Sequence, residues 1–156
     1  MSTTYSCSRG IRGQSLVELA AGLMVMLPVI LVLVDLAIIT TAIQVNDATC
    51  RDAARVAAAG EPIGTNIQDR AKQVIKEAYQ SGGYITGPTL VEAKGIGIVA
   101  PDATYGGPYQ GRVSVETEIV VRVPASIPTL TPDKVTLHSK QEFPVTFVKQ
   151  NTFNPL

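Results

Sequence analysis

Tryptophan is absent from this chain of 156 residues, and histidine occurs only once, as His138. Cysteine occurs twice, and aromatic residues make up only 5% of the chain. A lone histidine with no cysteine or carboxylate cluster at ligand spacing argues against a metal centre, and the scattered Tyr and Phe form no stacking platform. No serine, cysteine or lysine has a recognisable base partner. The sequence therefore predicts a protein that is not an enzyme and has no cofactor, metal or small-molecule substrate.

Net charge is also missing, since 13 basic and 13 acidic residues balance to zero. No segment is strongly basic, and electrostatics therefore give no support to nucleic acid as a partner.

Apolar residues, by contrast, are concentrated near the N-terminus. Between residues 19 and 45 the only side chain that would be charged is Asp35. A helix needs about 20 residues to cross the hydrocarbon core, so this run predicts one membrane span over 19–45. It is longer than a secretory signal and ends in no Ala-x-Ala site, which predicts that it is retained.

Basic residues flank only one side of the run. Arg9 and Arg12 precede it, and the next basic residue is Arg51. The positive-inside bias therefore predicts a single-pass protein of the cytoplasmic (inner) membrane, with the N-terminus inside and the rest of the chain exported.

The same helix is expected to continue past the span, over residues 14–59, to Gly60 and Pro62. Its second half is predicted to be amphipathic, with an Asp47–Arg51 pair on its surface. The predicted small-residue face comprises Ile43, Ala48, Cys50, Ala54 and 57–59. Cys50 is expected to be buried on this face; a disulfide to another chain is the alternative.

The start of the run carries a further pattern, Arg12-Gly13-Gln14-Ser15-Leu16-Val17-Glu18. A basic leader ending in Gly, then four residues, Glu and an apolar helix resembles the class III signal of type IV pilin-like proteins. With "VDLAI" at 34–38 and "NDATCRDAARVAAAG" at 46–60, the segment resembles the TadE-like proteins. These are minor pilins or pseudopilins of the tight-adherence (Flp) pilus.

The resemblance covers roughly residues 9–60 and implies a function in pilus assembly, for adhesion or secretion. It implies that a prepilin peptidase removes a cytoplasmic leader, residues 1–13, by cutting between Gly13 and Gln14. The implied partners are this peptidase, other pilins and the pilus platform proteins, with incorporation into an extracellular pilus. Major pilins of the system consist almost entirely of the helix, so the longer chain fits the minor class.

Glu18 would then be the fifth residue of the mature chain. The resemblance implies that its carboxylate neutralises the N-terminal amine of a neighbouring subunit, and an unpaired amine close to apolar surroundings is indeed costly. The alternative is a carboxylate that sits in the headgroups and is favoured by the helix dipole.

Asp35 lies deep in the predicted span, so it should face protein or water rather than lipid. One possibility is contact with a basic group of another pilin or of the platform. The other is a protonated Asp35 that hydrogen-bonds Thr40 or Thr41 of a neighbouring copy.

The remaining residues predict an exported α+β domain over 61–150, with a loose tail at 151–156. A second helix is indicated by apolar residues at helical spacing, with a capping box at Thr65 and Gln68; they are Ile67, Ala71, Val74, Ile75 and Ala78.

The clearest strand, 112–123, has alternating apolar residues, five of which lie on one face; they are Val113, Val115, Ile119, Val121 and Val123. Shorter strands are expected in 89–100 and 134–148, with Pro144 at an edge or bulge. "GIGIVAP" at 95–101 lacks the following helix of a phosphate loop and is expected to be a strand with close backbone approach.

The predicted architecture is therefore α+β: a long helix over 14–60, and a short helix packed on a small antiparallel sheet of three or four strands. The alternative to a pilus function is a single-pass, signal-anchored module whose exported domain binds or senses a ligand.

Overall fold

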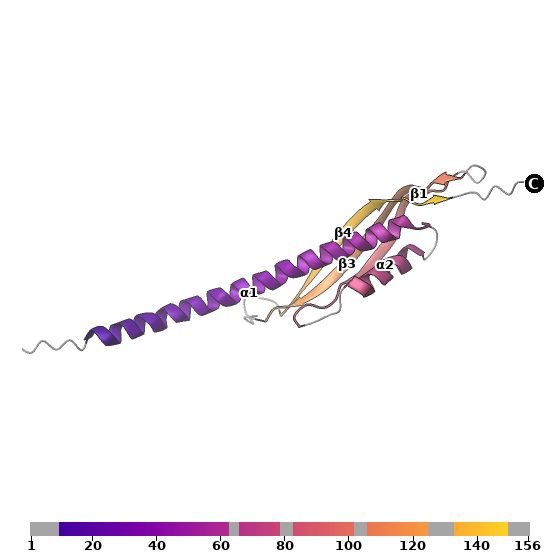
Figure 1. Ribbon diagram of the computed structural model, residues 1–156. Coiled ribbons are helices and arrows are strands. Elements are labelled where there is room, and N and C mark those ends of the chain that lie inside the picture. The colour runs from indigo at the N-terminus through magenta and orange to yellow at the C-terminus, as the bar shows by residue number, and fades with distance from the viewer. Residues whose placement is uncertain (1–9, 63–65, 79–82, 102–105, 125–132, 150–156) are drawn as a thin grey trace, which may run out of the picture.

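The computed structural model describes residues 10–62, 66–78, 83–101, 106–124 and 133–149. It contains a very long N-terminal helix, a short second helix and an antiparallel three-stranded sheet. The predicted mixed α+β architecture is therefore confirmed. The second half of the long helix lies along the sheet, and its first half extends away from the rest of the molecule (Figure 1).

The long helix, α1, spans Gly10–Ala59 and has 50 residues, with Pro28 inside it. It begins one turn before the expected start at Gln14, so the chain is already helical at Gly13. It ends immediately before Gly60, as expected. Gly60 does not adopt a positive φ, so its role is not that of a left-handed helix cap.

The close approach of the Arg70 side chain explains the glycine at position 60 instead. A Cβ at this position would lie 2.5 Å from Cζ of Arg70. The Arg70 guanidinium crosses the end of α1 here and donates to the carbonyl oxygens of Ala57 and Glu61, at 2.9 and 3.1 Å. Burial lowers the pKa of Arg70 from its ordinary value, and the Glu61 carboxylate counteracts part of this shift. Arg70 thus satisfies one of the carbonyls that every helix C-terminus leaves open.

The second helix, α2, spans Asn66–Ala78. Ile67, Ala71 and Ile75 are buried, and Val74 is half-buried, as the apolar face predicts. Ala78 differs from the prediction because it ends the helix and faces solvent. The predicted capping residue, Thr65, lies outside the described residues, as does the tail at 151–156.

The sheet consists of β1 (Thr89–Val99), β3 (Gln110–Arg122) and β4 (Lys134–Pro144), in the order β1-β3-β4. A separate two-stranded ribbon joins β2 (Gly107–Pro108) to β5 (Val148–Lys149). The five apolar residues expected on one face of 112–123 are all buried, so the predicted phase of this strand is correct. Pro144 is the last residue of β4, an edge strand of the sheet, as its missing N–H requires.

Close backbone approach in "GIGIVAP" is also confirmed. The register between β1 and β3 shifts between Ile96 and Val99. Gly97 and Gly111 both have positive φ, at 60° and 127°, and a Cβ on Gly111 would lie 2.7 Å from the Gly97 oxygen. Glycine is favoured at both positions by the positive φ, and at Gly111 also because a side chain would collide with the neighbouring strand at this bulge.

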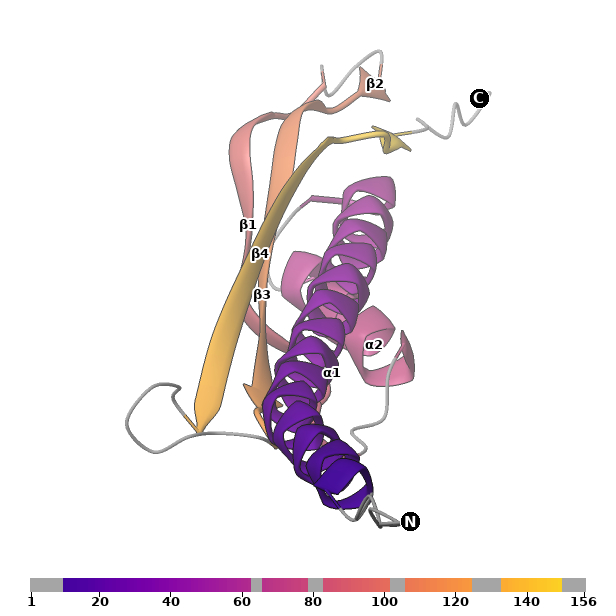
Figure 2. The same cartoon turned by 90° about the vertical axis from the view of Figure 1, so that its left-hand side faces the viewer.

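The helices and the sheet form two layers. Both α1 and α2 lie on the same face of the sheet, and the opposite face carries no helix among the described residues (Figure 2). Between the layers is the main core, which is built from small helix residues and strand valines. A satellite cluster of Ala42, Ile119 and Val121 extends it toward the protruding half of α1.

The buried face of α1 differs in part from the predicted one. Its buried residues are mostly small; they are Ala42, Asn46, Thr49, Cys50, Ala53, Ala54, Ala57 and Ala58. Ile43, Ala48 and Ala59 were expected on this face but are exposed. Ala48 and Ala59 lie about 160° and 180° from Cys50 around the helix axis, on the side away from the sheet. Ile43 is only about 20° from Cys50, so its exposure does not follow from its angular position.

Candidate functional site

The most unusual surface of the molecule is the first half of α1. We call residues 15–37 of this helix the stalk, and the described residues from 38 to 149 the head. All stalk residues except Asp35 are exposed, although nearly all of them are apolar. Monomeric soluble proteins rarely expose an apolar surface of this extent, so the stalk requires a lipid or protein environment.

A single helix among the described residues is long and apolar enough to cross a membrane, and it contains the stalk. Its most apolar window has a mean hydropathy of 2.7, with no residue buried inside the head. A buried core helix would pass the same test of composition but would be covered by the fold. Exposure therefore supports a membrane anchor more directly than composition does.

The residues of the predicted processing and assembly sites lie at the start of α1. The backbone of Gly13 and Gln14 is helical. Glu18 lies one turn further along the helix and is exposed. A carboxylate that points away from its own chain is available to a partner, which the predicted assembly role needs and the headgroup alternative also permits.

Asp35 lies at the other end of the stalk and is half-buried. It is one turn before Ile38 and Ile39, which pack against the satellite cluster of the head. The structure thus places Asp35 at the junction of stalk and head. Thr40 and Thr41 donate their hydroxyl hydrogens to Leu36 and Ala37 of their own helix, and their oxygens remain able to accept a hydrogen bond.

Glu18 and Asp35 do not form one site. They are separated by about 25 Å along the axis and by about 100° around it, from 1.5 Å and 100° per residue. Each carboxylate therefore serves a separate contact.

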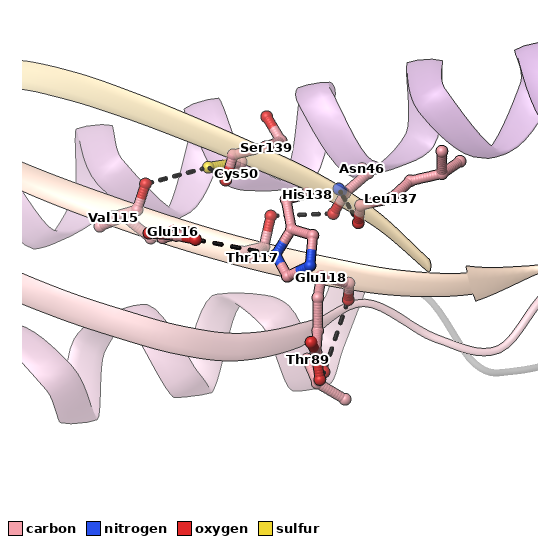
Figure 3. A network of polar contacts seen from close by, with 10 residues as sticks. All are labelled: Asn46, Cys50, Thr89, Val115, Glu116, Thr117, Glu118, Leu137, His138 and Ser139. Carbon is pink, nitrogen blue, oxygen red and sulfur yellow. Dashed lines mark hydrogen bonds and ion pairs between the residues drawn. The ribbon is translucent and has the colours of Figure 1, made fainter. Parts of the chain in front are cut away.

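Five polar side chains join α1 to the sheet, and we call Asn46, Asp47, Cys50, Thr117 and Ser139 the polar clamp. Figure 3 shows four of them, all except Asp47. Asn46 accepts a hydrogen bond from the Thr117 hydroxyl at 2.8 Å and donates to the Leu137 carbonyl at 3.2 Å. Ser139 donates its hydroxyl hydrogen to the Asp47 carboxylate. The Cys50 thiol lies 3.3 and 3.4 Å from the carbonyl oxygens of Val115 and Ser139.

The clamp settles two expectations about α1. The predicted Asp47–Arg51 ion pair is not formed among the described residues; Asp47 turns toward Ser139 instead. Cys50 is a free thiol with none of its surface exposed, as the small-core-residue prediction states. A disulfide to another chain would require this part of the core to open.

His138 lies on the opposite face of the sheet and is exposed, as predicted. Its Nδ1 is 3.7 Å from Oε1 of Glu116, and Figure 3 shows both side chains on the side away from α1. Among the described residues, no group of three or more metal-binding side chains lies together.

The end of the head far from the stalk has a cleft of about 530 Å³, lined by Glu61, Phe147, Val148 and Lys149. Behind it, Tyr109 packs against Phe147 with ring centroids 5.8 Å apart. Its hydroxyl donates to the Glu61 carboxylate at 3.4 Å. Burial raises the pKa of Tyr109, and Glu61 adds to the rise because it stabilises the protonated phenol. This cleft is wide open to solvent and has both polar and apolar lining residues.

Sequence reasoning did not identify Asn46 and Thr117, which are both buried. Their positions offered a signal, because each falls in phase with the apolar residues of its own element: Asn46 lies four residues after Ala42, and Thr117 lies between Val115 and Ile119.

Comparisons with known proteins add no relative, since the chain matches no protein-family model, no curated protein and no solved structure.

Proposed function

We propose that this chain is an assembly protein of a type IV-like pilus, a minor pilin or pseudopilin of the TadE-like kind. The observation that carries the proposal is the uncovered stalk, which bears Glu18 near its start and continues into the part of α1 that packs on a folded head. An apolar helix of this kind can first be stored in a membrane and then packed against other helices in a filament. The proposed function is non-enzymatic.

The chemistry at the N-terminus supports the same proposal. Cleavage between Gly13 and Gln14 by a prepilin peptidase creates an amine next to an apolar helix, where an unpaired positive charge is costly. Glu18 is four residues away on an exposed surface. Pairing of this carboxylate with the amine of a neighbouring subunit compensates both charges and sets the axial offset between subunits.

The proposed location follows from the flanking charges. Arg9 and Arg12 hold the leader in the cytoplasm, the stalk spans the inner membrane and the head is exported. The proposed partners are the peptidase, other pilins and the platform proteins of the pilus.

The intact mass and N-terminal sequence of the protein from its native membrane test the processing step. We expect a chain that begins at Gln14. A chain that retains residues 1–13 contradicts the proposal and leaves Glu18 as an ordinary headgroup carboxylate.

Glu18→Ala tests the assembly step. We expect this variant to insert into the membrane normally but to be lost from sheared pilus fractions, because the neighbouring amine has no counter-charge. Glu77→Ala removes an exposed carboxylate from α2 and is the matched control. Normal incorporation of Glu18→Ala would remove Glu18 from the mechanism.

The distal cleft favours a second candidate, a signal-anchored module that binds a ligand outside the cytoplasm. An uncleaved chain together with saturable ligand binding that Lys149→Ala or Glu61→Ala abolishes would favour this candidate over the pilus function.

A further inference from the structure

The polar clamp allows positions on α1 to be matched to positions on the sheet. Asn46 is level with Thr117, and Cys50 is level with Val115, because these pairs are in hydrogen-bonding contact. Four helix residues rise about 6 Å, and two strand residues rise about 6.7 Å. Helix and strand therefore run side by side in opposite directions, as Figure 1 also shows.

The end of the head nearest the stalk can be located from the rise per residue of the helix and the strand. Arg122, the last residue of β3, lies about 17 Å beyond Thr117 at 3.4 Å per residue. Asp35 lies about 16 Å before Asn46 at 1.5 Å per residue. Arg122 is thus level with Asp35, at the point where the helix leaves the head.

A row of three exposed side chains crosses the sheet at this level, and we call Tyr84, Arg122 and Lys134 the proximal row. Lys134 is directly opposite Arg122 in the register of β3 and β4. Tyr84 is on the other side, where its carbonyl accepts a hydrogen bond of 2.8 Å from the Arg122 amide. The Tyr84 residue is 53% exposed.

The two cations of the proximal row, Arg122 and Lys134, repel each other. Like charges directly opposite each other on neighbouring strands destabilise a sheet. Among the described residues neither Arg122 nor Lys134 forms an ion pair. Asp133 adjoins Lys134 in the chain, and Asp35 is at the same level on α1. Arg122 and Lys134 are both exposed, so an outside anion can approach them.

The part of α1 between this level and Ser15 is about as long as a bilayer is thick. Residues 15–34 are all exposed and extend for about 30 Å at 1.5 Å per residue, which is the thickness of the hydrocarbon core. Residues 38–45 were expected to lie within the span, but Ile38, Ile39 and Ala42 pack on the head. The head therefore limits how far the helix can enter lipid.

We propose that the proximal row rests on the phospholipid headgroups while residues 15–34 cross the bilayer, with Glu18 about 5 Å from the start of this segment, at the opposite headgroup boundary. This inference rests on the membrane insertion assumed in the proposed function. Arg122 and Lys134 contact lipid phosphates, and Tyr84 lies at the interface, where tyrosine is favoured. Asp35 then lies among the headgroups rather than at the bilayer centre, which removes most of the cost of a carboxylate inside a span.

Because the chain has no tryptophan, any Trp introduced is the only indole and reports its own depth. The full chain is reconstituted in phosphatidylcholine vesicles that carry either a nitroxide on the headgroup or bromines in the acyl chains. Tyr84→Trp is compared with Val148→Trp, because both residues are 53% exposed and they lie at opposite ends of the head. Tyr84 is hydrogen-bonded to Arg122 at the end of β3, and Val148 pairs with Pro108, which precedes the start of β3. Val25→Trp reports the depth of the stalk in the bilayer, and Ile43→Trp reports the depth of the part of α1 that belongs to the head.

We expect Val25→Trp to be quenched most strongly by acyl-chain bromine, and Ile43→Trp not to be quenched by it. Headgroup nitroxide should quench Tyr84→Trp several-fold more than Val148→Trp. Replacement of Arg122 and Lys134 by Gln should reduce that quenching, whereas Lys72→Gln with Lys76→Gln on α2 should not.

Three results would overturn the inference. If Tyr84→Trp is quenched no more than Val148→Trp while Val25→Trp is quenched, the head stands away from the membrane and the proposed function survives. If acyl-chain bromine quenches Ile43→Trp, the span reaches past Asp35 and the depth is wrong. If Val25→Trp is not quenched at all, the stalk does not insert, and both this inference and the proposed anchor fail.

Discussion

Asn46 shows how one polar residue can hold two layers together. It has only 1% of its surface exposed, and both ends of its amide are hydrogen-bonded to the sheet. A buried amide with both ends paired costs little, whereas the groups left behind when it is removed carry their full desolvation penalty.

We therefore expect Asn46→Ala to lower the free energy of unfolding by about 1–3 kcal/mol, because Thr117 and the Leu137 carbonyl lose their partner. Thermal unfolding of the full chain in detergent micelles, followed by circular dichroism, measures the change. Gln44→Ala, at an exposed position on the same helix, should change stability by less than about 0.5 kcal/mol. Equal effects of the two substitutions would show that the clamp adds nothing.

At this scale the sequence predicted the apolar core residues well and the buried polar ones poorly. Val113 and Val115 were assigned to the inner face by their alternation. Thr117 follows the same alternation, but a hydroxyl carries no preference for burial until a partner is present. That partner, Asn46, is 71 positions away in the chain.

At the scale of elements, the two halves of α1 differ in what surrounds them. Its first half presents branched and long apolar side chains outward, while its second half presents mainly alanine toward the sheet. Small residues let the helix axis approach the strands closely enough for Asn46 and Cys50 to reach strand atoms. Close packing between α1 and β3 is thus a condition for the polar clamp.

Ala54→Leu tests this condition. The Ala54 side chain is fully buried, and we expect its enlargement to destabilise the head by about 1–3 kcal/mol through overpacking. Ala48→Leu makes the same chemical change at an exposed position of the same helix and should be nearly neutral. Thermal unfolding of both variants gives the comparison. A small effect at Ala54 would indicate that the helix can move away from the sheet without loss.

The buried face of α1 was harder to predict from the sequence than the buried face of any other helix or strand. Alanines occur around most of its circumference between residues 48 and 59, so hydrophobic periodicity gives little contrast there. The helix α2 has a charged opposite face, and its buried residues Ile67, Ala71 and Ile75 were predicted correctly.

Considered as a whole, the molecule consists of a folded head and the stalk, the part of α1 that makes almost no contact with the head. The core clusters contain residues from Ile38 onward and none from the stalk. The head should therefore fold without the stalk.

A chain that begins at Ile38 should be soluble and should unfold within a few degrees of the full chain. A chain that begins at Cys50 lacks Ala42, Asn46 and Asp47 and should lose most of its stability, because the helix side of the satellite cluster and two of the five clamp side chains are removed. Circular dichroism of the two truncated chains checks this. Failure of the longer one to fold would assign the stalk a part in the stability of the head.

The sequence by itself determined the properties that depend on neighbouring residues. Helical continuity through 14–59, the apolar run before Asp35, the alternation of β3 and the spacing from Gly13 to Glu18 are all local patterns. Side-chain periodicity and chain length are sufficient to interpret each of them.

Only the tertiary structure decided where the stalk ends and what its carboxylates can contact. The apolar run continues smoothly to residue 45, and nothing local marks Ile38 as the first residue to pack on the head. That boundary depends on the register between α1 and a strand more than seventy residues later in the chain. Such a register is set by the sum of packing and hydrogen bonds across both layers, which no single segment encodes.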